Sequence, residues 1–283
     1  MSYYVAFDLG AESGRAVRGR IDAGKLSFAE THRFPNNSVS MRNTLHWDVL
    51  ALLDNIREGL RACVAEEGGD PAGIGIDTWG VDFGLLDEND NLLNNPVHYR
   101  DRRTEGMMEL AAEIVPREKI YEITGIAFQP FNTIYQLLAL KESSPPWWHH
   151  AHTLLLMPDL LHFLLCGRKV AEYTIASTSQ LLDATDRQWS EQLCEKFGFD
   201  RSLFCSIAEP GTLLGPLTEE NRRECNVGDV PVITPASHDT GSAFAAVPAE
   251  TDRWATLSCG TWSIMGTEIE SQWTNEKTSE LKY

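Results

Sequence analysis

The order of apolar runs in residues 1–80 limits the possible folds of this chain more than any other feature. The run at 3–9 ends in Asp-Leu-Gly, and two further runs follow at 15–21 and 25–34. Turn residues separate the three runs. Short apolar runs divided by Gly and Asp are typical of strands joined by tight turns. The beginning of the sequence therefore predicts an antiparallel meander.

A helix and a buried strand are expected after this meander. Between 47 and 67 the apolar residues recur at helical spacing, and Asp48 precedes them as the expected N-cap. The run at 73–80, GIGIDTWG, has the composition of a buried strand, and 81–86 is expected to continue as a strand. The predicted order of elements is therefore βββαβ.

The middle of the chain is predicted to be helical. Helices are expected at 104–114, 132–142 and 158–166, the last of which begins with Pro and is followed by Gly. We expect these helices to form a lid or insertion on one side. Strand patterns return at 230–234 and at 254–265, where an apolar strand, small residues and a second strand repeat the layout of the N-terminus.

The turn at 8–15, DLGAESGR, is a candidate anion site. Gly10 and Gly14 let backbone N–H groups come close to an anion, and Arg15 adds a cation beside them. The chain has no GxxxxGK[ST] loop, and an ordinary hairpin turn explains so short a glycine pattern equally well. Asp8 stands at a strand end, where a carboxylate could hold hydrated Mg²⁺ against phosphate oxygens.

Ser237, His238 and Asp239 stand side by side after the apolar run at 230–234. They are the side-chain types of a hydrolytic triad. Neighbours in extended chain point to opposite faces, however, whereas a triad needs three groups that converge from separate segments. The sequence therefore excludes a triad and leaves one or two of these side chains for a shared site. His238 fits a ligand contact and a structural histidine equally well.

The charge balance narrows the range of partners. Lys and Arg number 24 against 41 Asp and Glu, and the net charge of −17 repels phosphate backbones and anionic lipid surfaces. We therefore expect no nucleic acid partner and no membrane partner. Six cysteines without CxxC spacing, and an N-terminus without a basic region and a long apolar stretch, predict a reduced, cytoplasmic protein.

Several short motifs occur in a fixed order along the chain. They are FDLGAESGR (7–15), GIDTWGVDF (75–83), YRDRRT (99–104), FNTIYQLLAL (131–140), LLMPD (155–159), EYTIASTSQLLD (172–183), SHDTGSA (237–243) and SCGTWSIMG (258–266). This ordered set resembles the FGGY family of carbohydrate kinases over nearly the whole chain.

The resemblance implies an α/β protein with the actin-like, ribonuclease H-like fold, in which helices flank a mixed sheet. Two such domains would face each other across a cleft that holds sugar and ATP. Here 1–245 would be the sugar-binding domain and 246–283 the start of the nucleotide-binding domain. Family members are longer than this chain, so we expect the second domain to be truncated.

The resemblance also implies roles for the matching positions. Asp239 would be the general base for the attacking sugar hydroxyl, and Asp8 would hold Mg²⁺. ATP would phosphorylate the open-chain ketose L-rhamnulose at O1. The sugar contacts would come from Gly80, His238, Asp239 and Thr240, with supporting roles for Trp79, Arg100 and Asp101. The phosphate turns would consist of Ala11, Glu12, Ser13, Gly14 and Arg15, and of Thr261. Trp79 could also be a core residue, and Arg100 could belong to a solvated cluster of charges.

Two alternatives stay open at this point. Related kinases act on other ketoses or polyols, such as L-fuculose, D-xylulose or glycerol, and a few polar contacts in the pocket decide among them. A chain without a complete nucleotide domain could instead bind sugar without turning it over. Apolar surface exposed at the missing interface would then favour self-association.

Overall fold

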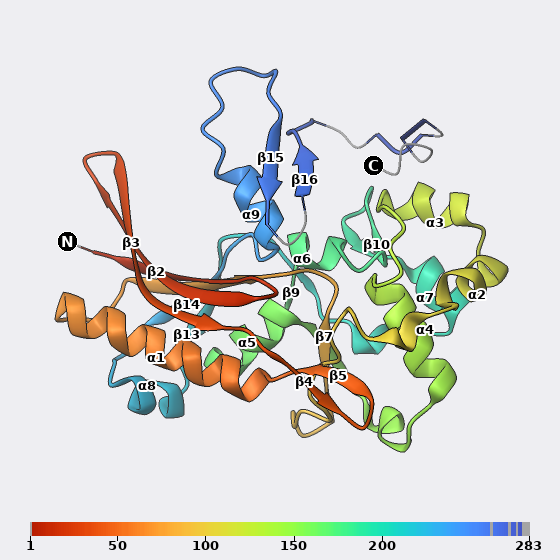
Figure 1. Ribbon diagram of the computed structural model, residues 1–283, viewed down its shortest axis with the longest axis horizontal. Helices are drawn as coiled ribbons and strands as arrows, with labels where there is room; N and C mark the ends of the chain where they lie inside the picture. Colours follow the sequence, from red (N-terminus) through yellow and green to blue (C-terminus); the bar gives the residue numbers. More distant parts are fainter. Residues whose placement is uncertain (1, 261–262, 271–272, 276, 279–283) are drawn as a thin grey trace.

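A six-stranded sheet fills one half of the molecule and lies over α1 (Figure 1). Its strand order is β13-β14-β6-β1-β2-β3. The computed structural model describes residues 2–260, 263–270, 273–275 and 277–278. The strands of the sheet are β1 (Tyr4–Leu9), β2 (Ser13–Asp22), β3 (Lys25–Pro35), β6 (Gly73–Thr78), β13 (Thr212–Pro216) and β14 (Pro231–Thr234). β1, β6 and β14 run parallel, whereas β2, β3 and β13 are antiparallel to their neighbours. The predicted meander and the mixed sheet are confirmed.

Two helices pack against one face of this sheet. Alternate side chains of β1, namely Val5, Phe7 and Leu9, are buried in one core with α1 (Val49–Glu67) and α5 (Met157–Cys166). Because successive side chains of a strand point to opposite faces, those between them point the other way. The face away from α1 and α5 therefore carries the polar side chains at the strand ends.

The ends of α1 are specified by local sequence, as predicted. The Asp48 carboxylate accepts a hydrogen bond from the Ala51 N–H at 3.1 Å, which satisfies one free donor of the first turn. At the other end Gly68 adopts a left-handed conformation with φ of 73°, and its N–H donates to the Val64 carbonyl. The helix expected at 47–67 is thus confirmed and begins at Val49.

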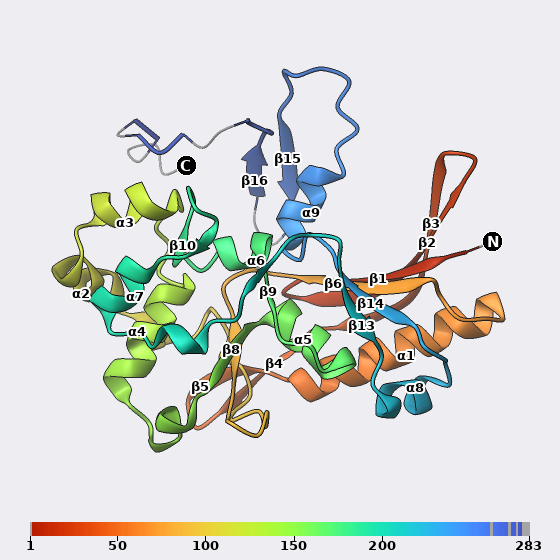
Figure 2. The same ribbon diagram turned by 180° about the vertical axis from the view of Figure 1, so that it is seen from behind.

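A second core lies at the other end of the molecule from α1, around a short pair of antiparallel strands (Figure 2). It is built from β7 (Phe83–Leu86), β8 (Thr153–Leu156), α2 (Met107–Ile114), α3 (Arg117–Thr124), α4 (Thr133–Ser143) and α7 (Glu191–Phe197). α3 was not predicted from the sequence. The strand expected at 81–86 begins only at Phe83, because a tight turn occupies 80–82.

The remaining elements are short. They are β4 (Ser38–Met41), β5 (Thr44–Trp47), η1 (Arg102–Thr104), η2 (Pro146–His150), β9 (Ala171–Glu172), α6 (Tyr173–Ser177), β10 (Leu182–Asp183), β11 (Gln188–Trp189), η3 (Arg201–Leu203), β12 (Ile207–Ala208), α8 (Glu219–Cys225), α9 (Asp239–Ala245), β15 (Thr256–Cys259) and β16 (Ser263–Gly266). β15 and β16 form the antiparallel hairpin that the sequence predicts at 254–265. Within the described residues, no helix combines the length and the apolar character that spanning a membrane requires.

Candidate active site

The carboxyl ends of β1, β6 and β14 meet at one edge of the sheet. Asp8 and Asp77 are direct neighbours in the parallel register of β1 and β6. The chain beyond β14 stays beside β6, because the Thr78 N–H donates to the Ser237 carbonyl at 2.9 Å, and it enters α9 at Asp239. Ligands of open α/β sheets bind outside the carboxyl ends of the strands. Three carboxylates, from segments far apart in sequence, are therefore gathered where a ligand is expected.

Asp8 is paired with Arg15 across the first turn. Arg15 Nη2 lies 2.5 Å and Nε 2.9 Å from the same oxygen of Asp8, and both side chains are partly exposed. The predicted Mg²⁺ ligand and the predicted phosphate cation thus neutralise each other. To act in either role, Asp8 or Arg15 must bind its ligand while the ion pair is kept or broken. Breaking it costs little, because exposed ion pairs contribute about 0–1 kcal/mol.

The turn between β1 and β2 is held from two sides. The Gly10 N–H donates to the Ser13 carbonyl at 2.9 Å, and the Asn36 side chain donates to the Gly10 carbonyl at 2.9 Å. Gly14 has no room for a side chain, because a Cβ there would lie 2.7 Å from Leu9 Cδ2. Ala11 is half-buried and Glu12 is exposed. The sequence did not single out Asn36, which is buried and also donates its N–H to the Glu12 carbonyl.

Asp77 is a site residue that the sequence reasoning missed. Its Oδ1 is buried and has no hydrogen-bond partner in the described part of the chain. Burial raises the pKa of the Asp77 carboxyl well above its usual range, and the negative charges of Asp8 and Asp239 raise it further. The motifs FDLG and GIDTWG each place an Asp at the end of an apolar strand. Had the sequence reasoning paired these two strands in parallel, it would have placed Asp77 beside Asp8.

Asp239 is the first residue of α9 and follows its N-cap, His238. Its side chain is 33% exposed and lies 3.6 Å from His238 Nε2. Its Oδ1 accepts hydrogen bonds from the Thr240 N–H at 2.6 Å and the Thr240 hydroxyl at 3.1 Å. Burial raises the pKa of the Asp239 carboxyl against the opposing effect of His238, and burial lowers the pKa of the His238 imidazole. Asp239 can therefore be reached by a ligand and is more basic than an ordinary aspartate.

A strained turn follows β6 at Gly80. The Asp82 N–H donates to the Gly80 carbonyl at 2.9 Å, and Val81 between them has φ of 70°. A β-branched residue rarely adopts positive φ, and a three-residue turn of this hand is strained. Neighbours hold it in place: the Val81 N–H donates to Thr178 Oγ1 at 3.0 Å, and the Val81 carbonyl accepts from Thr133 Oγ1 at 2.7 Å.

Asp82 anchors this turn in the core. It is 1% exposed and accepts hydrogen bonds from the indoles of Trp47 at 2.6 Å and Trp79 at 3.1 Å. The Tyr99 N–H and Gln136 Nε2 donate to it as well. Burial raises the pKa of Asp82 to about 6 despite these bonds. Trp79 is 5% exposed and its ring packs against Trp47, so protein covers the faces that a sugar would stack on.

The other predicted site residues have local structural contacts or lie outside the described part. Asp101 uses both oxygens on backbone N–H groups, those of Leu45 at 2.8 Å and Arg103 at 3.0 Å. Arg100 is exposed, with its guanidinium 5.3 Å from the Tyr99 ring centroid. Thr261 lies outside the described residues.

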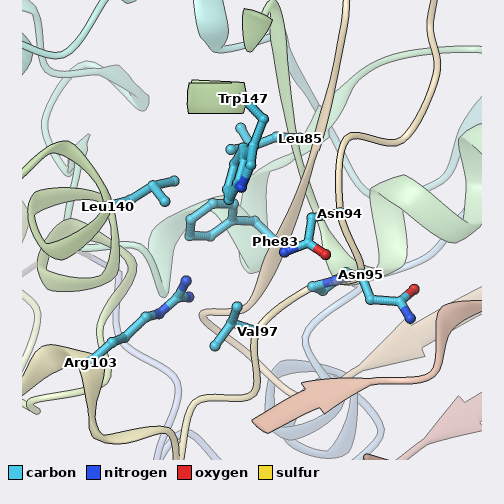
Figure 3. Close-up of a pocket in the computed structure, with 9 residues that line it drawn as sticks. Phe83, Leu85, Asn94, Asn95, Val97, Arg103, Leu140 and Trp147 are labelled. Carbon is cyan, nitrogen blue, oxygen red and sulfur yellow. The ribbon is translucent and has the colours of Figure 1, made fainter. Parts of the chain in front are cut away.

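Two hollows among the described residues lie away from Asp8, Asp77 and Asp239. A cavity of about 20 Å³ lies by Phe83, Arg103 and Trp147, as Figure 3 shows, and it has room for about one water molecule. A hollow of about 230 Å³ lies by Asn36 and Asp48. Across the residues that the structure describes, no three His, Cys, Asp or Glu side chains are grouped so as to bind a metal.

Comparisons with known proteins agree with the sequence motifs. Residues 3–245 match the FGGY family of carbohydrate kinases, N-terminal domain. The chain is 43% identical to a rhamnulokinase of Oceanobacillus iheyensis over 289 aligned residues, which cover 99% of the chain and 61% of that relative. It is 46% identical to a rhamnulokinase of Halalkalibacterium halodurans over 95% of the chain and 56% of that relative. The chain thus spans somewhat more than half the length of these relatives.

Solved structures show the same fold at lower identity. A carbohydrate kinase from Novosphingobium aromaticivorans superimposes with a TM-score of 0.76 at 22% identity, covering 94% of this chain and 56% of that one. A xylulose kinase from Rhodospirillum rubrum gives a TM-score of 0.75 at 22% identity, covering 86% and 51% of the two chains. The actin-like fold expected from the sequence is therefore confirmed.

Proposed function

The chain belongs to the FGGY family of carbohydrate kinases, and on this premise we propose that it transfers the γ-phosphoryl group of ATP to O1 of L-rhamnulose. The observation that carries the proposed chemistry is the position of Asp239, a partly exposed carboxylate with a raised pKa, close enough to Asp8 for their charges to interact. The identity of 39–46% with five curated rhamnulokinases supports the choice of substrate.

In the proposed reaction, the O1 hydroxyl attacks the γ-phosphorus in line. A bond forms between O1 and phosphorus, the bond from phosphorus to the bridging oxygen of ADP breaks, and Asp239 accepts the O1 proton. Phosphoryl transfer depends mostly on positioning and on neutralising charge, so a moderately basic carboxylate suffices. The two hydrogen bonds from Thr240 fix the Asp239 carboxyl and leave Oδ2 for the sugar. Gly80 and His238 would contact the other hydroxyl groups, with Trp79, Arg100 and Asp101 behind them.

The phosphates of ATP would lie on the turn from Ala11 to Arg15. Gly10 is partly exposed in this turn, and Arg15 supplies a cation beside it. Thr261 would contribute from the second turn. Mg²⁺, when bound, would neutralise phosphate charge, and Asp8 fits it because Mg²⁺ takes few protein carboxylates and keeps most of its water. We propose 1–245 as the sugar-binding domain and 246–283 as the start of the nucleotide-binding domain.

A coupled assay of ADP release tests the proposal. We expect the highest kcat/KM with L-rhamnulose among L-rhamnulose, L-fuculose, D-xylulose and glycerol. Asp239→Asn should lower kcat at least about 100-fold, because general base catalysis contributes a factor of about 10²–10⁴. The matched control is Asp54→Asn, an exposed residue of α1, which should leave the rate unchanged. A full rate for Asp239→Asn would refute its role as base. Sugar binding without ADP release would favour a sugar-binding module instead.

A further inference from the structure

Glu172 is a fully buried carboxylate that the proposed chemistry does not use. It ends β9 and stands directly before α6, with 0% of its surface exposed. A buried carboxylate is costly unless hydrogen bonds satisfy it. Glu172 Oε1 accepts from the Thr174 N–H at 2.9 Å, and Oε2 accepts from the Thr174 hydroxyl at 2.6 Å and the Ile175 N–H at 3.1 Å. These three bonds cap the first turn of α6.

A fourth hydrogen bond leaves this helix. The Ser237 N–H donates to Glu172 Oε2 at 3.0 Å across 65 residues of sequence. The next amide, that of His238, donates to Thr174 Oγ1 at 3.2 Å. Because the Thr174 hydroxyl in turn donates to Glu172, two consecutive backbone N–H groups are held by one carboxylate, directly and through one hydroxyl. Capping α6 alone would need only a short side chain such as Ser or Asp.

The held segment leads directly into the proposed base. Ser237 is fully buried, and its carbonyl accepts the Thr78 N–H from the end of β6 at 2.9 Å. The segment is therefore fixed on one side by the sheet and on the other by Glu172 and Thr174. Asp239 is the next residue after His238 and begins α9, so its backbone position depends on this segment.

The other end of α6 reaches the turn at Gly80. Thr178, the C-cap of α6, accepts the Val81 N–H on its Oγ1 at 3.0 Å and donates to the Ile175 carbonyl at 2.7 Å. One short helix thus contacts both the segment before Asp239 and the strained turn. A shift of α6 would move the two relative to each other.

We infer that Glu172, together with Thr174, is a positioning residue that fixes Asp239 relative to the Gly80 turn. This inference rests on the proposed function, in which Asp239 is the base and Gly80 contacts the sugar. A carboxylate suits the place because all four of its partners are donors. A glutamine would present its NH₂ group to some of them and leave donors without an acceptor.

Paired threonine variants test the inference in the full chain. Thr174→Val removes the hydroxyl at nearly constant volume, whereas Thr174→Ser keeps it. We expect Thr174→Val to lower kcat with L-rhamnulose about 10–100-fold, since a misplacement of about 1 Å can cost about 10²-fold. The KM for ATP should change less than about twofold, and Thr174→Ser should restore most of kcat. Glu172→Gln should lower kcat in the same way.

A control and an independent readout separate positioning from general loss of stability. Thr31 lies on β3, at the sheet edge opposite β13, and its hydroxyl donates to the Ala16 carbonyl at 3.3 Å. Thr31→Val should lower the unfolding midpoint and leave kcat unchanged. Hydrogen exchange of the Ser237 and His238 amides should be about 5–10-fold faster in Thr174→Val, which corresponds to one lost hydrogen bond of about 1 kcal/mol.

The outcomes are distinguishable. Equal kcat in Thr174→Val and Thr31→Val, or unchanged exchange of both amides in Thr174→Val, would overturn the positioning role. Absence of turnover in the unmodified chain would count against the proposed function instead. The exchange comparison would then decide by itself whether Glu172 and Thr174 hold the segment before Asp239.

Discussion

Replacing Gly80 by alanine would press a methyl group against Thr178. A Cβ at position 80 would lie 3.0 Å from Thr178 Cγ2 and 3.1 Å from both Thr178 Cβ and Oγ1. Gly80 is not among the described glycines with positive φ, so its backbone conformation admits alanine. The cost of the substitution is therefore steric, and its size depends on whether Thr178 can move aside.

Thr178 has little freedom to move. Its Oγ1 accepts the Val81 N–H at 3.0 Å and donates to the Ile175 carbonyl at 2.7 Å. Overpacking a filled site costs about 1–3 kcal/mol, and a lost hydrogen bond about 1 kcal/mol. Alanine also stabilises the folded state by about 0.4–1 kcal/mol, because it lowers the conformational entropy of the unfolded chain relative to glycine. We therefore expect Gly80→Ala to lower the free energy of unfolding by about 1–3 kcal/mol.

Urea unfolding followed by tryptophan fluorescence measures this cost. Gly69→Ala is the matched control, because a Cβ there meets nothing within 4 Å, and it should be neutral or slightly stabilising. Thr178→Ser removes the Cγ2 methyl and keeps the hydroxyl, so adding it to Gly80→Ala should restore about 1 kcal/mol or more through a favourable coupling between the two sites. Wild-type stability for Gly80→Ala, or strict additivity with Thr178→Ser, would refute the steric reasoning.

Two further predictions concern buried groups around the sheet. His162 Nε2 accepts the Ile76 N–H at 3.1 Å, and burial lowers the His162 pKa from 6.5 to about 3. Its contribution to stability is complete above pH 6.5 and is lost as the pH falls towards 3, so about 2 kcal/mol should disappear between pH 6.5 and about 4.5. Urea unfolding measured at several pH values should show this loss of stability in the wild type but not in His162→Gln. An equal dependence of the free energy of unfolding on pH in both proteins would contradict the prediction. Gly59→Ala would gain about 1 kcal/mol of helix propensity in α1, but its Cβ would lie 2.8 Å from Ala16 Cβ and 3.0 Å from Phe7 Cε1. The overpacking cost of about 1–3 kcal/mol should exceed the gain in helix propensity, so we expect Gly59→Ala to lower the thermal midpoint of unfolding. A raised midpoint would contradict this prediction.

The sequence alone determined the elements whose signals are local. The meander at the N-terminus and α1, with Asp48 as its cap, follow from side-chain periodicity and turn residues within short windows. The place of Asp8 at a strand end pointed to a Mg²⁺ ligand, and the ordered motifs led to the FGGY family, which pointed to Asp239 as the base. Such features can be read from the sequence because neighbouring residues carry all of the information. α3 was missed because it is short, half of its eight residues, REKIYEIT, are charged, and no capping side chain marks where the helix begins.

Only the tertiary structure decided which side chains share a site. Asp8 meets Asp77 through the register of two parallel strands, and Glu172 meets Ser237 across 65 residues. The pairing of Asp8 with Arg15, and the burial of Trp79 against Asp82, likewise depend on which side-chain atoms approach each other. Hydrogen bonds and ion pairs act over about 3 Å between atoms, and that proximity is set by how the sheet and helices pack rather than by the order of residues along the chain.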